Sequence, residues 1–281
     1  MPYTALITGA NSGLGLATAQ ALARQNFDLI FLVRSREKGE WARQQVLQQS
    51  PQARIELFFA DLTNLAALRQ AAEAIQKRYD RIDRLINNAG YAPASIEYTP
   101  EGYERSFIAN HLGHFVLTFE LFDLLRASGE ARIINVSSAA HALGKARRFF
   151  VKNNTALNIW TTYGDGKLAN ILFTQELARR LEGQPITAYA LHPGVVNSQF
   201  GQNFLGSWKV GFGLLRPFMI TPEEGARTAV YLSTASVPES YNGKYFSKSR
   251  PTRILSTDAN AYNGQLLWKL SEQAAGIRWL S

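Results

Sequence analysis

Tyr163 and Lys167 are spaced so that their side chains could carry out acid–base chemistry. They stand four residues apart in a segment of helical periodicity, which places both on one face of the expected helix. A tyrosine, with a reference pKa of about 10, is a weak base at neutral pH, but a nearby ammonium group favours the phenolate. The pair could therefore exchange a proton near neutral pH. By itself the same spacing also fits two ordinary surface neighbours, so its meaning depends on the surrounding residues.

A glycine-rich turn near the N-terminus is a second pattern with chemical meaning. The sequence T-G-A-N-S-G-L-G at Thr8–Gly15 stands between an apolar run, Tyr3–Thr8, and an amphipathic helical run, Leu14–Arg24. Glycines permit positive φ and close approach of a ligand to the main chain, while a helix N-terminus offers unpaired N–H groups. We expect the turn to hold the pyrophosphate of a dinucleotide. A glycine turn without a ligand is the alternative.

Arg34 indicates which dinucleotide this would be. In dinucleotide-binding folds the residue about 20 positions beyond the glycine turn, at the end of the second strand, meets the adenosine ribose. The sequence here is V-R-S at 33 to 35, which offers a guanidinium for a 2′-phosphate and no carboxylate for a free 2′-hydroxyl. This favours NADP(H), unless Arg34 is a solvated residue at a helix start. Asp61 could receive the adenine amino group, with Thr63 or Asn64 capping the next helix.

Strand-like and helical segments alternate along the whole chain, which predicts parallel crossovers. The expected strands are Tyr3–Thr8, Asp28–Val33, Ile55–Phe59, Leu85–Asn88, Arg132–Val136 and Thr187–His192. Beyond the first helical run, the expected helices are Ser35–Gln49, Leu65–Tyr79, Pro100–Ala127, Thr161–Leu181 and Pro222–Thr234. We predict an α/β fold, a single-domain doubly wound (Rossmann) parallel sheet over residues 1–281 with helices on both faces. Its ligands would lie where the strands end.

Composition narrows the functional class. The chain has no cysteine, which excludes thiol chemistry and fits a reducing compartment. The first strand begins almost at the N-terminus, and no apolar run approaches the ~20 residues that span a bilayer. We therefore expect a cytoplasmic protein without an integral membrane segment. A net charge of +8 could suggest nucleic acid, but we expect none, because the densest basic patch is small: Lys145, Arg147, Arg148 and Lys152.

Several motifs in a fixed order resemble the short-chain dehydrogenase/reductase family across most of the chain. They are T-G-A-N-S-G-L-G at 8 to 15, Asp61-Leu62, N-N-A-G at 87 to 90, N-H-L-G-H-F at 110 to 115, V-S-S at 136 to 138, Y-G-D-G-K at 163 to 167 and H-P-G at 192 to 194. The N-H-L-G-H-F motif, the run K-L-A-N-I-L-F and the late L-W-K-L-S-E resemble its retinol-dehydrogenase-like group.

The resemblance implies an oxidoreductase that moves hydride between NADP(H) and a carbonyl/alcohol pair. Tyr163 would be the general acid/base, and Lys167 would lower its pKa and hold the nicotinamide ribose. Ser138 would hydrogen-bond the substrate oxygen. Asn110 would hold a water that links Lys167 to solvent, a role compatible with satisfying a kink in its helix. The resemblance also implies a homodimer or homotetramer, although a monomer is an alternative.

Cofactor contacts are expected along the strand ends. Asn88 would support the fourth strand near the adenosine ribose, and the loop after His192 would border the nicotinamide carboxamide. The full set of expected cofactor-binding residues is Gly9, Asn11, Ser12, Gly13, Leu14, Gly15, Arg34, Asp61, Leu62, Asn88, Ala89, Gly90, Tyr163, Lys167, Pro193, Gly194, Val196 and Ser198.

The chain departs from the family pattern at two places. Gly166 stands where related sequences usually carry serine, which should be tolerable. Ser138 lies 25 residues before Tyr163, a longer gap than in the family's shortest members. This implies an insertion around Gly144–Trp160, which is shared by the retinol-dehydrogenase-like group and would help form the substrate rim.

The four histidines have other expected roles. His111 and His114 are three residues apart, but we expect no metal there because no carboxylate or thiolate is spaced to complete a site. His192 should be structural or line the cofactor. His141 could reach the substrate.

The segment 199–220 is aromatic and rich in glycine without a clear period, and we interpret it as a substrate lid. Its apolar side chains would favour a lipophilic substrate over a sugar. The alternatives are a pair of core-packed helices or a peripheral membrane contact. The residues that would form the wall are Phe200, Phe204, Leu205, Trp208, Phe212 and Phe218.

Two other functions compete with an NADP(H)-dependent oxidoreductase. A regulator that senses NADP(H) would bind cofactor without turnover, and the intact set Asn110, Ser138, Tyr163 and Lys167 argues against it. A light-driven tetrapyrrole reductase is suggested by G-L-G-L-A-T-A at 13 to 19. The absence of cysteine, which that group uses, counts against it.

Overall fold

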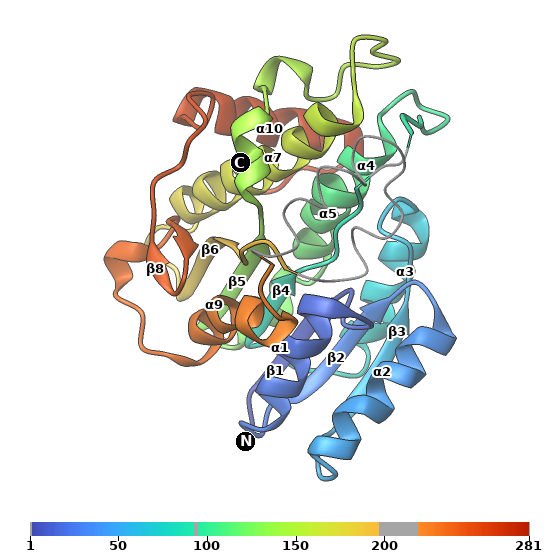
Figure 1. Ribbon diagram of the computed structural model, residues 1–281, viewed down its shortest axis with the longest axis vertical. Helices are drawn as coiled ribbons and strands as arrows, with labels where there is room; N and C mark the ends of the chain where they lie inside the picture. The colour runs from blue at the N-terminus through green and yellow to red at the C-terminus, as the bar shows by residue number, and fades with distance from the viewer. Residues whose placement is uncertain (1, 93–94, 197–218, 281) are drawn as a thin grey trace.

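One sheet organises the part of the chain that the computed structural model describes, residues 2–92, 95–196 and 219–280 (Figure 1). Its strands follow the order β3-β2-β1-β4-β5-β6-β7-β8, and only β8 runs antiparallel to its neighbour. The strands are β1 Thr4–Thr8, β2 Asp28–Val33, β3 Ile55–Phe59, β4 Arg84–Asn87, β5 Ala131–Val136, β6 Ile186–His192, β7 Tyr245–Ser247 and β8 Arg250–Pro251. The six predicted strands are confirmed to within one residue at each end, whereas β7 and β8 were not predicted.

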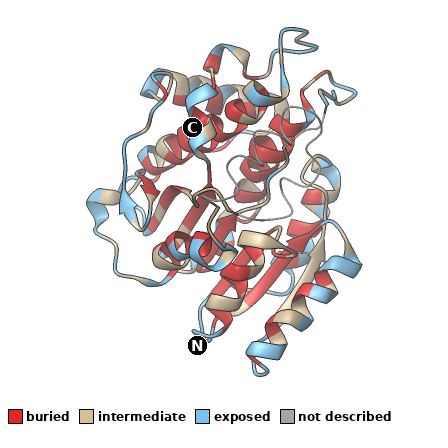
Figure 2. Cartoon of the chain, in the orientation of Figure 1, coloured by how far each residue is buried: buried red, intermediate tan, exposed pale blue. Residues whose placement is uncertain are grey.

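Alternate residues of the strands face two separate apolar cores, one on each side of the sheet. On β2, Leu29, Phe31 and Val33 pack with one cluster, while Ile30 and Leu32 pack with the other. The first cluster includes helices α1 (Gly13–Ala23) and α9 (Pro222–Thr234), and the second includes α3 (Leu65–Gln76), α5 (Gly113–Glu120), α7 (Ile159–Arg180) and α10 (Ala261–Ala275). Figure 2 shows the buried sheet between these layers. The predicted doubly wound α/β fold is confirmed, because strands buried on both faces are what a parallel sheet covered by crossover helices requires.

The long helices mostly follow the predicted segments. They are α1 Gly13–Ala23, α2 Arg36–Gln49, α3 Leu65–Gln76, α5 Gly113–Glu120, α7 Ile159–Arg180, α9 Pro222–Thr234 and α10 Ala261–Ala275. Asn64, and not Thr63, caps α3 by accepting the N–H of Ala67 at 3.0 Å. Helix α10 was not predicted.

The prediction of one helix over Pro100–Ala127 was wrong. The segment begins with a turn, and helix α4 (Arg105–Phe107) starts only where the Glu104 carboxylate accepts the N–H groups of Ser106 and Phe107. A π-helical turn at Ile108–Leu112 then precedes α5, and the chain breaks again at Leu121 before α6 (Phe122–Ala127). The π-helical turn brings Asn110 into the site described below.

The strand order reverses between β1 and β4, which are neighbours in the sheet. Because the connections leave these two strands in opposite directions, a crevice opens at their carboxyl ends, and this is where such folds bind ligands. Thr8 ends β1 and Asn87 ends β4, so the glycine turn and the N-N-A-G motif meet at this point.

Candidate active site

The start of α1 forms a cradle suited to a phosphate group. Gly9 and Gly13 have φ of +65° and +49°, and a Cβ on Gly15 would lie 2.3 Å from the Gly9 carbonyl oxygen. These positions therefore require glycine. Among the described residues, the N-cap residue Ser12 makes no side-chain hydrogen bond to the helix, so the first N–H groups of α1 remain available to an anion. Side chains cap the other long helices that begin after loops: Ser35, Asn64, Asn158, Thr221 and Asn260.

Thr8 and Asn88 fasten the glycine turn to the end of β4. The Asn88 amide donates to the carbonyl oxygens of Thr8 at 2.8 Å and Gly9 at 3.3 Å. In return, Thr8 Oγ1 accepts the backbone N–H groups of Asn88 and Ala89, both at 2.9 Å. The two halves of the expected cofactor site are thus joined by side-chain hydrogen bonds.

Arg34 and Asp61 lie next to each other at the ends of β2 and β3. The Arg34 guanidinium is 75% exposed and lies 3.7 Å from the Asp61 carboxylate. Burial alone would raise the pKa of Asp61, but hydrogen bonds from Thr63 and the charge of Arg34 outweigh it and hold the pKa below its usual value. The neighbouring Arg36 stacks on the ring of Phe59 at 4.3 Å, so Arg34 is the arginine that can reach a ligand.

The loop after β6 closes over the start of α1. A Cβ on Gly225 would meet Val196 at 2.6 Å, Leu14 at 3.3 Å and the Pro193 carbonyl oxygen at 3.5 Å, so these predicted cofactor residues converge on one glycine of α9. Gly194 has φ of +95°. Ser198 lies outside the described residues, as does most of the predicted lid, 199–218.

The predicted catalytic hydroxyls meet beside β5. The Tyr163 hydroxyl is hydrogen-bonded to the side chain of Ser138, which itself accepts the N–H of Ala140 at 3.2 Å. Lys167 Nζ lies 5.5 Å from the centroid of the Tyr163 ring and donates to the Val136 carbonyl oxygen at 3.0 Å. Helix α7 and the end of β5 therefore hold the three side chains together.

Burial changes the acidity of both predicted proton-transfer groups. It raises the pKa of the Tyr163 phenol above its ordinary value, although the hydrogen bond with Ser138 acts in the opposite direction. Burial also lowers the pKa of Lys167 to about 8. The spacing of the pair predicts the attraction between ammonium and phenolate, but it does not reveal the desolvation that disfavours both charged forms.

Asn110 lies in the π-helical turn, fully buried. Its amide donates to the carbonyl oxygens of Ser106 at 2.8 Å and Tyr91 at 2.6 Å, and its Oδ1 accepts the Tyr91 N–H at 3.1 Å. The amide thus satisfies a carbonyl freed by the irregular turn and fixes the loop after β4. Gly166 lies against it, because a Cβ there would be 2.9 Å from Asn110 Cβ.

Comparison with known proteins decides the family. The model of the family described as short chain dehydrogenase matches residues 3–206. The chain belongs to this family. Retinol dehydrogenase 12 from Mus musculus is 36% identical over 277 residues, which cover 98% of this chain and 86% of that protein. The predicted resemblance to the retinol-dehydrogenase-like group is therefore confirmed.

Solved structures agree with this assignment. A crystal structure of an uncharacterised protein from Mycobacterium paratuberculosis has a TM-score of 0.78 and 31% identity, and the match covers 99% of this chain and 96% of that one. The active-site complex of RhlG with NADP from Pseudomonas aeruginosa has a TM-score of 0.68 and 25% identity over 83% of this chain and 90% of that one.

In this short chain dehydrogenase, the predicted insertion is clamped onto α7. Arg148 makes two hydrogen bonds to the buried Asp165 carboxylate, at 2.7 and 2.6 Å, and the Lys145 N–H donates to it at 2.8 Å. Gly144 and Gly164 let the two backbones touch, since a Cβ on Gly164 would lie 2.8 Å from the Ala140 carbonyl oxygen. The sequence shows Arg148 only as part of a basic patch and Asp165 only as part of the motif Y-G-D-G-K, because their pairing depends on the fold.

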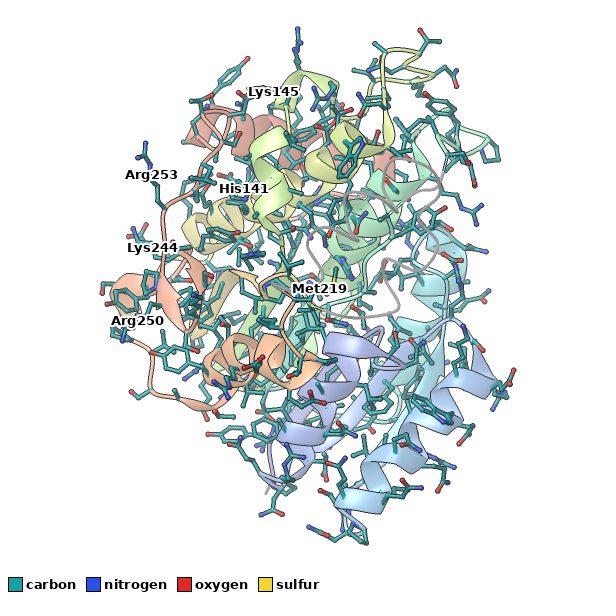
Figure 3. All side chains as sticks on the ribbon, viewed as in Figure 1. His141, Lys145, Met219, Lys244, Arg250 and Arg253 are labelled. Atoms are coloured by element: carbon teal, nitrogen blue, oxygen red, sulfur yellow. The ribbon has the colours of Figure 1, made fainter. Side chains whose placement is uncertain are left out.

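The histidines serve as structural hydrogen-bonding groups. His141, labelled in Figure 3, has both ring nitrogens engaged: its Nδ1 contacts the Ser138 carbonyl oxygen at 2.7 Å and its Nε2 accepts the Leu255 N–H at 2.9 Å. A contact between His141 and the substrate stays a prediction. His192 Nδ1 accepts the N–H of Ala139 at 3.3 Å, as its predicted structural role requires. Both histidines support the Ser138 segment.

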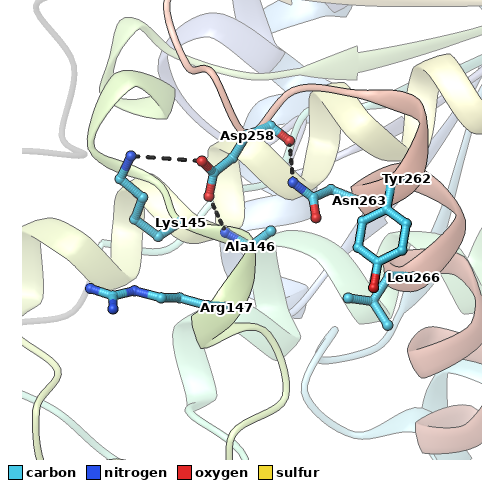
Figure 4. A pocket seen from close by; sticks show the side chains of 7 residues that line it. All are labelled: Lys145, Ala146, Arg147, Asp258, Tyr262, Asn263 and Leu266. Carbon is cyan, nitrogen blue, oxygen red and sulfur yellow. Dashed lines mark hydrogen bonds and ion pairs between the residues drawn. The ribbon is translucent and has the colours of Figure 1, made fainter.

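Outside the site, the described part of the chain has a surface pocket beside the insertion. Among the described residues, no three His, Asp or Glu side chains converge in a way that could hold a metal ion, and no helix is long and apolar enough to cross a membrane. This surface pocket lies between Lys145, Arg147 and Tyr262, where Asp258 accepts hydrogen bonds from Ala146 and Asn263 (Figure 4). None of its lining residues belongs to the site.

Proposed function

We propose that this protein is an NADP(H)-dependent oxidoreductase that interconverts a carbonyl and an alcohol on a lipophilic substrate. The observation that carries the proposal is the hydrogen-bonded pair of hydroxyls on Ser138 and Tyr163, with the buried amine of Lys167 beside it. Both hydroxyls can hydrogen-bond to the same substrate oxygen. They lie in a chain of the short chain dehydrogenase family, beside the crevice where the sheet order reverses.

Each side chain has a defined task in this proposal. NADP(H), when bound, supplies or accepts the hydride at its nicotinamide ring. Tyr163 gives a proton to the carbonyl oxygen in reduction and takes one from the alcohol in oxidation. Ser138 donates a hydrogen bond to the same oxygen and stabilises the charge that develops there. Lys167, whose pKa of about 8 leaves it mostly charged at neutral pH, favours the phenolate.

Three features support NADP(H) as the cofactor. The glycine turn leaves N–H groups available for a pyrophosphate, and Asn88 ties that turn to β4. Arg34 is exposed and its ion pair with Asp61 is long, at 3.7 Å, so its guanidinium can rotate toward a 2′-phosphate. The similar RhlG structure was obtained with NADP.

A lipophilic substrate is supported by the apolar rim of the insertion and by the relatives. Leu143 and Trp160 are 49% and 38% exposed, and Leu143 packs on Gly164, next to Tyr163. Several relatives are retinol dehydrogenases, whose named substrate is a lipophilic alcohol.

The proposal is tested by following NADPH absorbance with a panel of aldehydes and ketones. We expect turnover with long-chain and polyene aldehydes and little with hydrophilic sugar carbonyls. Tight binding of NADPH without turnover of any member of the panel, in either direction, would favour a regulatory sensor instead.

A further inference from the structure

His114 occupies a buried position between the π-helical turn at Ile108–Leu112 and two loops expected to hold the cofactor, the glycine turn at 9–15 and the loop at 88–90 after β4, here called the cofactor loops. It is the second residue of α5, and both of its ring nitrogens are engaged. Nδ1 lies 3.1 Å from the Asn110 carbonyl oxygen and Nε2 lies 3.0 Å from Thr8 Oγ1. Because a carbonyl only accepts, Nδ1 carries the proton, and in the neutral ring Nε2 accepts the hydroxyl proton of Thr8. Each ring nitrogen thus has one hydrogen-bond partner, with Nδ1 as the donor and Nε2 as the acceptor.

The contact with His114 fixes the orientation of the Thr8 hydroxyl group. With its proton directed at His114, the Thr8 oxygen turns its lone pairs to the N–H groups of Asn88 and Ala89. Its other potential acceptor, the Ile86 carbonyl oxygen, is more distant at 3.4 Å. His114 therefore helps hold the loop after β4 against the glycine turn.

The contact with Asn110 connects His114 to the helix α7, which carries Tyr163 and Lys167. Asn110 is bonded to Tyr91 through both ends of its amide and lies against Gly166 of the catalytic helix. One imidazole thus connects Thr8, which fixes the cofactor loops, to Asn110, which contacts the helix that carries Tyr163 and Lys167.

We propose that His114 is a positioning residue whose neutral imidazole keeps the cofactor loops in register with Asn110 of the π-helical turn. The effect on cofactor affinity rests on the proposed function. The effect on the loops themselves does not, because the hydrogen bonds of Thr8 to Asn88 and Ala89 are part of the fold.

His111 provides a matched control one helical turn away. It is equally buried and also hydrogen-bonded. Its Nε2 contacts Ser271 of α10 at 2.8 Å and its ring packs against Phe173, so neither partner belongs to the cofactor loops. Among the described residues, its Nδ1 has no partner. His111→Phe should therefore perturb packing without loosening the site.

The first test needs no cofactor. Amide hydrogen exchange is measured by mass spectrometry on peptides that cover residues 86–92 in the wild type, His114→Phe, His114→Gln and His111→Phe. We expect faster exchange at Asn88 and Ala89 in His114→Phe. His114→Gln, which keeps a donor and an acceptor, should restore part of the protection, and His111→Phe should match the wild type.

The second test measures the dissociation constant of NADPH by fluorescence titration, with kcat measured alongside. His114→Phe should weaken binding by about 5- to 30-fold, the range expected for one or two lost buried hydrogen bonds. Thr8→Val should weaken NADPH binding too. The double variant should bind NADPH no more weakly than the single variant with the larger loss, because both substitutions remove the same hydrogen bond between Thr8 and His114. Thr8→Ser should bind as the wild type does.

The outcomes separate the two proposals. If no variant changes exchange at residues 86–92, or if the effects of Thr8→Val and His114→Phe simply multiply, His114 has no positioning role. If the exchange result holds but the wild type binds no NADP(H), the positioning role stands and the proposed function fails. Should His114→Phe not fold, His114→Gln and the threonine variants decide by the same criteria.

Discussion

At the Tyr163 hydroxyl, burial and hydrogen bonding act in opposite directions. Burial keeps the phenol protonated, and only positive charge close to the oxygen can bring its pKa into the working range. Lys167 lies beside the ring and donates to the Val136 carbonyl oxygen. The sequence identifies the Tyr163–Lys167 pair from its spacing together with the surrounding motifs, but the burial that shifts both pKa values comes from the packing of α7 on β5 and cannot be inferred from spacing.

Arg34 carries a prediction about cofactor choice. Arg34→Asp replaces a guanidinium with a carboxylate that repels a 2′-phosphate and can accept a 2′-hydroxyl. We expect the ratio of NADH to NADPH affinity to rise by roughly 10- to 100-fold, equivalent to one or two charge-assisted hydrogen bonds. Fluorescence titration with both nucleotides measures it.

Arg36→Ala is the control for that substitution, because Arg36 is already stacked on Phe59. It should leave the preference between the two nucleotides unchanged. If the wild type binds NADH more tightly than NADPH, the role assigned to Arg34 is wrong.

The hydrogen-bond partners of the buried histidines could not be predicted from the sequence. His141 was a candidate for substrate contact, but its nitrogens are used by Ser138 and Leu255, which are remote from each other in sequence. His114 carried no expected role apart from a rejected metal site, yet it joins Thr8 to Asn110. Hydrogen-bond partners of buried polar groups are set by tertiary packing, so residue type alone cannot assign them.

Among the elements, the contact between α7 and the segment after Ser138 depends on glycine. Gly164→Ala would place a Cβ 2.8 Å from the Ala140 carbonyl oxygen, and backbone atoms cannot easily move away. We expect a loss of about 1–3 kcal/mol in the free energy of unfolding and a lower kcat, because Ser138 and Tyr163 lie on the two elements that would separate. Urea unfolding and steady-state rates measure the two effects.

Gly264 of α10 supplies the matched control. A Cβ there would find its nearest neighbour at 3.6 Å, an ordinary contact. Gly264→Ala should leave kcat unchanged and stabilise the protein by up to about 1 kcal/mol through helix propensity. Equal effects of the two substitutions would show that close packing at Gly164 is unimportant.

Element boundaries were predictable where a strand or helix obeys its own periodicity. The six predicted strands are short, largely apolar runs, most of them buried apart from the half-buried edge strand β3, and the sequence places them within one residue. The π-helical turn at Ile108–Leu112 keeps a helical pattern of side chains, so periodicity cannot reveal it. Strand β7 has three residues and β8 two, too few for any period to be visible.

For the whole molecule, the buried histidines predict acid sensitivity. Burial lowers the pKa of His111 to about 3 and of His114 to about 4, from 6.5. Above pH 6.5, both the folded and the unfolded chain hold them neutral. As the pH falls from 6.5 to about 4, the unfolded chain binds protons that the folded chain does not, so the free energy of unfolding should fall by a few kcal/mol, on the order expected for such shifts.

Urea unfolding at a series of pH values from 7.5 to 4.5 measures this decline. His111→Phe removes one of the two groups, so its stability should fall less steeply over the same interval. A variant that loses stability with pH as steeply as the wild type would show that His111 is not held neutral by burial.

In the proposed reaction, Tyr163 transfers the proton that accompanies hydride transfer, and the variant Tyr163→Phe isolates this role. The variant keeps the ring and removes the hydroxyl. In a single-turnover experiment with saturating NADPH and an active lipophilic aldehyde, we expect its rate to fall at least about 100-fold, with the dissociation constant of NADPH changed less than about twofold, well under one hydrogen bond. A variant that binds NADPH normally and turns over at the wild-type rate would contradict the assignment of Tyr163 and the mechanism built on it.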